Sequence, residues 1–165
     1  MKAAWKVEYA RLYEEDFKKK YPTAYKDQGA PEMKWPKVST ANGLTMAIIR
    51  LLTWKGYYAN RISTQGQARV HRFQRFDIMS GKLVDQERTR WTKGNTKRGT
   101  PDISAIVHGK AVWIEVKIGK DKMSKAQEEQ KVEIETAGGL YFIAKTMEEF
   151  YEWYINKFER TPGAR

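Results

Sequence analysis

The chain has 165 residues and a mass of 19.3 kDa, and its 41% hydrophobic and 13% aromatic content predicts one folded domain rather than a disordered chain. It contains no cysteine, which excludes disulfides and cysteine-ligated zinc, and no apolar stretch has the length of a membrane span or the pattern of a signal peptide. We therefore expect a cytoplasmic protein with no membrane partner.

The net charge of +11 is concentrated in one part of the chain. Residues 50–100 hold 12 Lys and Arg against 3 Asp and Glu, whereas residues 1–49 hold 9 against 6 and residues 101–165 hold 10 against 11. A localised basic segment of this kind indicates a polyanionic partner, and nucleic acid is the commonest one.

Residues 1–38 are predicted to form an N-terminal helical extension. Aromatic and aliphatic residues recur at helical spacing from Ala3 to Lys20, and Tyr21-Pro22 ends this pattern. Residues 22–38 contain three prolines and a glycine, which predicts an irregular connector. We expect the aromatic stripe of the helix to pack onto the following domain or onto a second subunit.

A helix and a strand are predicted to follow. Ser39 or Thr40 can cap a helix that runs to about Lys55, and residues 57–62 alternate weakly, as in a strand. Asn42 lies at the start of this helix, where its short amide side chain can bond to backbone groups.

Residues 63–98 interleave basic and aromatic side chains, and their only predicted element is a hairpin that turns at Ser80-Gly81. This interleaving suits phosphate contacts combined with base stacking, although the aromatic residues alone are better explained by packing into the core. The candidate DNA-binding residues are Arg69, Arg72, Arg75, Arg88, Arg90, Lys93, Lys97 and Arg98, together with Lys120 and Lys122 from a later basic loop.

The stretch from Gly99 to Lys117 organises the chain. Residues 103–107 and 111–116 are rich in β-branched residues and flank His108-Gly109, which predicts a tight hairpin. Because side chains alternate along a strand, Val112, Ile114 and Val116 share one face, which is expected to be the buried one.

The same geometry predicts a cluster of charges at one end of the sheet. Glu115 and Lys117 share the other face of the second strand, and Asp102 precedes the first strand. Two carboxylates and one ammonium on a rigid platform suit a divalent-metal site for phosphodiester chemistry. The alternative is a solvated strand face with Asp102 as a turn residue, but this leaves the opposed acid in the most apolar strand unexplained.

The remainder of the chain is predicted to be a helix, a strand and a helix. Ser124 can cap the first helix, with Gln127 at capping-box spacing, and Gly138-Gly139 ends it. The apolar strand over residues 140–144 is expected to be paired on both sides, and residues 161–165 are expected to be a tail.

Pro101-Asp102, a short hairpin and then Glu115-Val116-Lys117 resemble the PD-(D/E)XK nuclease motif. Gly99 before it and Ser124 and Gln127 after it resemble the VRR-NUC branch of that superfamily, over roughly residues 40–158. The resemblance implies an α/β domain at residues 39–160 with a restriction-endonuclease-like core, in which helices flank a small mixed β-sheet.

The resemblance also implies roles for individual residues. Asp102 and Glu115, with the carbonyl of Val116, would bind Mg²⁺ or Mn²⁺, and Lys117 would orient the attacking water or stabilise the phosphorane charge. A family glutamine corresponding to Gln127 lies near the active site, although one side chain is not expected both to cap a helix and to reach that site. Where the family usually has an acid, Asn42 would either hold a metal-bound water or line the start of the helix.

Small stand-alone relatives resemble phage-type nucleases, often dimerise and favour branched or flapped DNA. The resemblance thus implies an Mg- or Mn-dependent deoxyribonuclease, endonuclease rather than exonuclease, acting as a homodimer in the cytoplasm of a bacterial or phage-infected cell. One alternative is a non-catalytic nucleic-acid-binding protein on the same scaffold. Another is a protein-interaction subunit that uses the aromatic terminal helices.

Overall fold

The computed structural model describes residues 3–62, 67–92 and 97–160, so the predicted tail at residues 161–165 lies outside the described residues. The chain divides into two compact units. The core unit comprises residues 1–62 and 99–165, and the ribbon unit comprises residues 63–98.

The core unit contains a four-stranded sheet in the order β1-β4-β5-β6. The strands are β1 (Tyr58–Arg61), β4 (Ile103–Val107), β5 (Lys110–Val116) and β6 (Leu140–Ala144). β4 pairs antiparallel with both β1 and β5, whereas β5 and β6 are parallel. The predicted α/β class with a small mixed sheet and flanking helices is therefore confirmed.

The β4–β5 hairpin follows directly from its sequence. His108 and Gly109 form a two-residue connection with φ values of 48° and 75°, and Val107 pairs with Lys110 across it. Positive φ at both turn residues gives the twist that neighbouring strands prefer. Val112 and Ile114 are buried, which confirms the predicted core face of β5.

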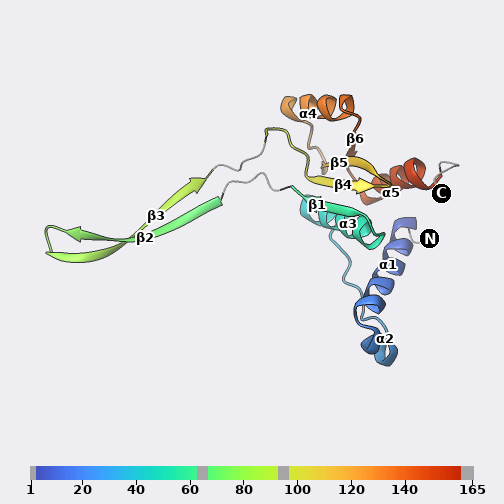
Figure 1. Ribbon diagram of the computed structural model, residues 1–165, viewed down its shortest axis with the longest axis horizontal. Helices are drawn as coiled ribbons and strands as arrows, with labels where there is room; N and C mark the ends of the chain where they lie inside the picture. Colours follow the sequence, from blue (N-terminus) through green and yellow to red (C-terminus); the bar gives the residue numbers. More distant parts are fainter. Residues whose placement is uncertain (1–2, 63–66, 93–96, 161–165) are drawn as a thin grey trace. The chain divides into compact units, whose positions relative to one another are not determined.

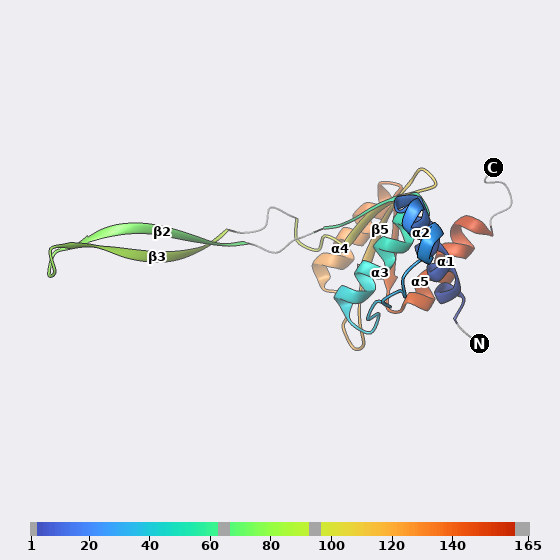
Figure 2. The same ribbon diagram turned by 90° about the horizontal axis from the view of Figure 1, so that it is seen from below.

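Helices cover both faces of this sheet, with α4 on one side and α3 on the other (Figure 1). α3 (Ala41–Trp54) begins after Thr40, whose hydroxyl oxygen accepts a hydrogen bond from the Gly43 N–H at 3.1 Å. α1 (Ala4–Lys20) and α5 (Met147–Tyr154), which continues as the π-helical turn η1 (Ile155–Glu159), pack beside α3 (Figure 2). None of the described helices has the length and apolar character needed to span a membrane.

Most aromatic residues of the terminal helices are packed within the core unit, whereas Tyr13 and Phe17 are only partly buried. Trp5 and Tyr9 are buried, and the Trp5 indole N–H donates to a Glu148 carboxylate oxygen at 2.7 Å. Phe150 and Tyr154 are also buried, in the same cluster. This packing covers most of the aromatic side chains on which the homodimer prediction was based, and the homodimer stays a prediction.

The prediction of an irregular connector over residues 22–38 is wrong for its first part. A short helix, α2 (Pro22–Gln28), begins at Pro22. Proline is well suited to the first position of a helix, because its missing N–H would have no partner there and its φ is already helical.

The prediction that the strand over residues 140–144 is paired on both sides is also wrong. β6 is an edge strand, paired only with β5 among the described residues. Its apolar composition reflects helices on both faces, since Phe142 stacks on Trp153 of α5 with ring centroids 4.5 Å apart, while α4 packs on β6 as well.

The ribbon unit is a long antiparallel hairpin of β2 (Gln67–Asp77) and β3 (Lys82–Thr92). The predicted turn at Ser80-Gly81 is confirmed, but the strands are longer than the sequence indicated. Phe73, Phe76 and Trp91 are exposed, so the expectation that these rings pack into the core is wrong. A two-stranded ribbon has no second layer of its own to cover them.

Candidate functional site

The end of the β4–β5 hairpin places Asp102 beside β5. Ile103 pairs with Ile114, so Asp102 lies opposite Glu115 in the same register. An oxygen of Asp102, Oδ2, accepts a hydrogen bond from the Val116 N–H at 2.9 Å, while its backbone carbonyl accepts one from the Ile62 N–H at 2.8 Å. Asp102 is therefore held from both sides, by the end of β1 and by the end of β5.

Glu115 is a buried carboxylate, with 3% of its surface exposed. Its Oε1 accepts hydrogen bonds from the amide of Gln127 and from the Lys117 ammonium, the latter an ion pair of 3.2 Å. Its Oε2 is buried with no hydrogen-bond donor in the described structure. A buried, unpartnered carboxylate oxygen is costly, and a bound cation or a proton would compensate it.

The pKa of Glu115 also indicates that its carboxylate lacks a compensating positive charge. Burial first, and then the charge of Asp102, raise the pKa of Glu115 to about 7 against the opposing effect of Lys117. Without a further positive charge, the ionised form of Glu115 is thus poorly stabilised.

Lys117 is 7% exposed and lies between two carboxylates. Its Nζ is 3.2 Å from Glu115 and 3.3 Å from the Oδ2 of Asp121, which the sequence did not indicate as a site residue. Burial alone lowers the pKa of the Lys117 ammonium, but the hydrogen bond to Glu115 and the partner Asp121 outweigh it and raise the pKa. The burial of both Glu115 and Lys117 shows that the alternative of a solvated strand face is wrong.

Gln127 both caps α4 and contacts Glu115, two roles that were expected from the sequence to exclude each other. In the capping box at the start of α4 (Lys125–Thr136), its Oε1 accepts from the Ser124 N–H at 2.9 Å. Its Nε2 donates to Glu115. The expectation that one side chain does not do both is wrong, because the two ends of the amide group point to different partners.

Gly99 allows this arrangement. Its φ is +79°, and a Cβ at this position would lie 2.2 Å from the carbonyl oxygen of Ala126 and 2.8 Å from the Gln127 nitrogen. Only a residue without a side chain lets the backbone before Asp102 pass this close to the first turn of α4.

Asn42 is exposed, and its amide oxygen accepts a hydrogen bond from the Arg61 guanidinium at 2.5 Å. Thr40 rather than Asn42 caps α3. Asn42 therefore lines the start of the helix, and its oxygen is already occupied by the guanidinium of the residue that ends β1.

The described residues contain no cluster of three or more His, Asp or Glu side chains that could hold a metal. The available donor set is the two carboxylates of Asp102 and Glu115, with the Val116 carbonyl as a third oxygen. All-oxygen ligands suit Mg²⁺ or Mn²⁺, which keep several waters when bound. The unpartnered Oε2 of Glu115 is the feature of this site that fits a cation.

Tyr141 is a site residue that the sequence did not reveal. It pairs with Trp113 in the parallel register of β5 and β6, and therefore shares the face of Glu115. Its hydroxyl is buried without a hydrogen-bond partner in the described structure. Burial first, and then the charges of Glu115 and Asp102, raise the pKa of Tyr141. Only the β5–β6 register could have identified it, and that register is not local in the sequence.

The predicted DNA-binding residues of the ribbon are divided between its two faces. Cross-strand partners share a face, so Arg69 and Arg90 lie together, as do His71 and Arg88. Arg72 lies on the opposite face in an ion pair of 2.7 Å with Glu87. Of the remaining candidates, Lys93 lies outside the described residues, and Lys97, Arg98, Lys120 and Lys122 are exposed.

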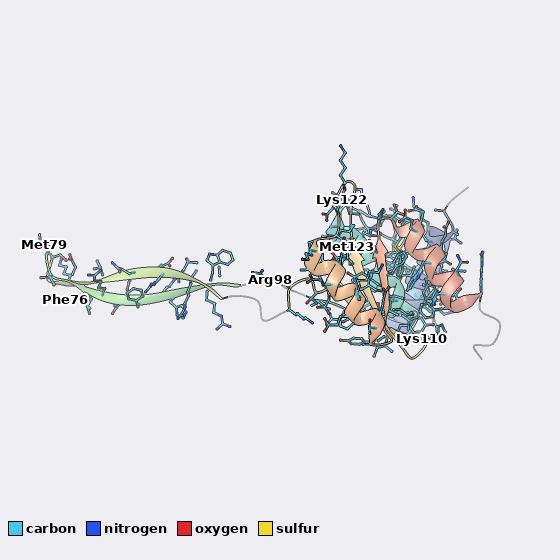
Figure 3. The ribbon with its side chains drawn as sticks, turned by 90° about the horizontal axis from the view of Figure 1, so that it is seen from above. Phe76, Met79, Arg98, Lys110, Lys122 and Met123 are labelled. Atoms are coloured by element: carbon cyan, nitrogen blue, oxygen red, sulfur yellow. The ribbon has the colours of Figure 1, made fainter. Side chains whose placement is uncertain are left out.

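Lys120 and Lys122 lie in the loop between β5 and α4, which also holds Asp121. The Lys122 side chain extends away from the core unit, at the end opposite to Lys110 (Figure 3). The loop therefore adds positive charge near the end of β5 where Asp102, Glu115 and Lys117 meet.

Comparison of the chain with protein-family models, with curated proteins and with solved structures finds no match. The assignment of a function therefore depends on the residues themselves.

Proposed function

We propose that the core unit is a metal-dependent deoxyribonuclease with a restriction-endonuclease-like core, similar to the VRR-NUC branch of the PD-(D/E)XK nucleases. The observation that carries the proposal is the buried Glu115. It stands beside Asp102 with one carboxylate oxygen bound by Lys117 and Gln127 and the other without a donor. A helix-covered sheet does not need such a group for its stability.

The residues of the site have distinct tasks in this proposal. Asp102 and Glu115, with the Val116 carbonyl, hold Mg²⁺ or Mn²⁺. The bound cation would supply a Lewis acid for the phosphate and lower the pKa of a coordinated water. Lys117 orients the attacking water or stabilises negative charge on the phosphate in the transition state. Gln127 fixes the orientation of Glu115, and the reaction is expected to be endonucleolytic, with a preference for branched or flapped DNA.

A second candidate function is a non-catalytic DNA-binding protein on the same scaffold. The observation in its favour is that most of the excess positive charge lies in the ribbon unit, separate from the carboxylates. In that case the basic residues act alone, and Asp102, Glu115 and Lys117 have no part in any reaction.

Cleavage of linear, flapped and four-way DNA with Mg²⁺ or Mn²⁺ distinguishes the two functions. Asp102→Asn should abolish cleavage while the new amide oxygen still accepts from the Val116 N–H. Glu129→Gln, which removes an exposed carboxylate of α4, is the matched control and should cut at the wild-type rate. Ca²⁺ should bind without supporting cleavage, since it acidifies its water less. If the wild-type protein cuts none of the substrates, or if Asp102→Asn cuts equally well, the nuclease proposal is wrong. Non-catalytic DNA binding then becomes the favoured function.

Lys117→Met separates the roles of the ammonium and the cation. Its methyl group and thioether fill a similar volume, so metal affinity measured by calorimetry should remain. Cleavage should be slower by about 100-fold or more, because a positive charge near the reacting phosphate is lost. A variant that loses metal binding together with activity would contradict this division of roles.

A further inference from the structure

The ribbon unit has two chemically different faces. By the cross-strand register, one face carries a basic set and the other a mixed, more apolar one. On the basic face, the only acidic residue at the described strand positions is Asp77, next to the turn. The members of this basic face are Arg69, His71, Phe73, Arg75, Asp77, Lys82, Val84, Gln86, Arg88 and Arg90.

Apart from Asp77, which stands opposite Lys82, the basic face has no acidic residue at its described strand positions to offset its arginines. Arg69 stands directly opposite Arg90, so two guanidinium groups occupy paired positions on this face. Like charges in directly opposed cross-strand positions destabilise a hairpin. On the other face, by contrast, Arg72 is neutralised by Glu87 at 2.7 Å. A bound polyanion would turn the repulsion on the basic face into attraction.

The closed end of the ribbon is apolar. Ile78 is 87% exposed and Met79 is 95% exposed, and behind them Phe76 and Leu83 form an exposed cross-strand pair. Figure 3 shows Met79 at this end with Phe76 close behind it. The backbone of the turn is held by polar contacts rather than by these apolar side chains. The Asp77 carboxylate accepts hydrogen bonds from the Ser80 N–H at 3.2 Å and from the Met79 N–H at 3.4 Å.

We propose that the ribbon unit binds duplex DNA through its basic face and inserts Ile78 and Met79 where base stacking is interrupted, at a flap, nick or junction. A two-stranded ribbon fits the major groove of DNA, and apolar side chains are the groups that proteins insert between bases. The uncompensated arginines select a polyanion, and the apolar tip selects a site where unstacking costs little. This inference rests on the proposed function for its relevance to substrate choice, but it concerns binding alone.

The test measures DNA binding without divalent metal, in EDTA, by fluorescence anisotropy on intact, flapped and four-way duplexes. The tip variant Ile78→Ser/Met79→Ser should bind intact duplex like the wild type and lose about 10-fold in affinity for the branched forms. A 2-aminopurine placed at the branch should brighten on wild-type binding and stay dim with the tip variant. Val132→Ser, which alters an apolar residue of α4 that is 63% exposed, is the matched control.

A second variant separates the basic face from the tip. Arg69→Gln/Arg90→Gln should weaken binding to all duplexes and reduce the salt slope of log K by roughly 2, because each lost phosphate contact removes about 0.9. The tip variant should leave that slope unchanged, since an inserted apolar group releases no counterions.

Equal loss on branched and intact DNA, or no loss, from the tip variant would overturn the inference. It would also be overturned if the tip variant changed the oligomeric state by light scattering, since the tip would then be a contact between copies. A failure here leaves the nuclease proposal standing if wild-type protein still cuts DNA. Conversely, branch-selective binding by a protein that cuts nothing would support this inference and contradict the nuclease proposal.

Discussion

Replacing Gly99 by Ala tests whether the backbone before Asp102 supports the start of α4. The new Cβ would lie 2.2 Å from the Ala126 carbonyl oxygen, about 1 Å less than the roughly 3.3 Å of a close carbon–oxygen contact. Gly109→Ala is the matched control, because Gly109 has a similar φ of +75° and open space where its Cβ would be. The left-handed conformation alone costs about 1–2 kcal/mol in each variant. The steric overlap at Gly99 adds roughly 1–3 kcal/mol.

Urea unfolding of both variants measures the difference. We expect Gly99→Ala to lose roughly 2–5 kcal/mol of unfolding free energy and Gly109→Ala only about 1–2 kcal/mol. If the proposed nuclease activity is present, Gly99→Ala should also cut about 100-fold more slowly, because a displacement of about 1 Å moves Gln127 away from Glu115. Equal losses of stability in the two variants would refute the contact between Gly99 and α4.

Three further predictions concern the core unit. The hydrogen bond from Arg11, and then the ion pair with Lys55, lower the pKa of Glu8 from 4.5 to about 2, so the stability they give is present above pH 4.5 and is lost as the pH falls toward 2. Urea unfolding should therefore show Glu8→Gln to be about 2–3 kcal/mol less stable than the wild type at pH 7 and only about 0.4 kcal/mol less stable at pH 2, where Glu8 is half protonated; a difference that stays above about 1 kcal/mol at pH 2 would contradict this. Tyr141→Phe removes a buried hydroxyl that has no partner in the described structure, and a loss above about 1 kcal/mol in the same assay would show that the hydroxyl is bonded after all. Light scattering at high micromolar concentration tests the homodimer, which a monomeric mass would contradict.

Local patterns predicted the centre of the fold well. The β4–β5 hairpin depends on two turn residues and on alternation over a few positions, so the sequence placed Asp102 near Glu115 and the structure does the same. The caps at Thr40 and Ser124 are equally local, since each depends on a side chain and a backbone N–H three residues later.

The errors concern contacts that join distant parts of the chain. Tyr141 reaches the face of Glu115 only through the parallel pairing of β5 and β6, which no local pattern specifies. The apolar run of β6 indicated a central strand, although β6 lies at the edge of the sheet. An apolar run has the same appearance in a sequence whether helices cover the faces of the strand or other strands pair with both its edges. The aromatic residues of the ribbon were expected in a core for a similar reason. The sequence shows that these residues are apolar, but it does not show whether another layer of the fold packs against them.

The ribbon is inserted into the core unit at a particular place. The chain leaves the core after Ile62 and re-enters it at Gly99, and the Ile62 N–H is bonded to the Asp102 carbonyl at 2.8 Å. Both covalent attachments of the ribbon therefore lie next to the carboxylates. A molecule bound by the ribbon would thereby be covalently linked, through these two connections, to the unit that carries the carboxylates. The ribbon also becomes a module that could be exchanged for another without rebuilding the sheet, because its two points of attachment are already neighbours.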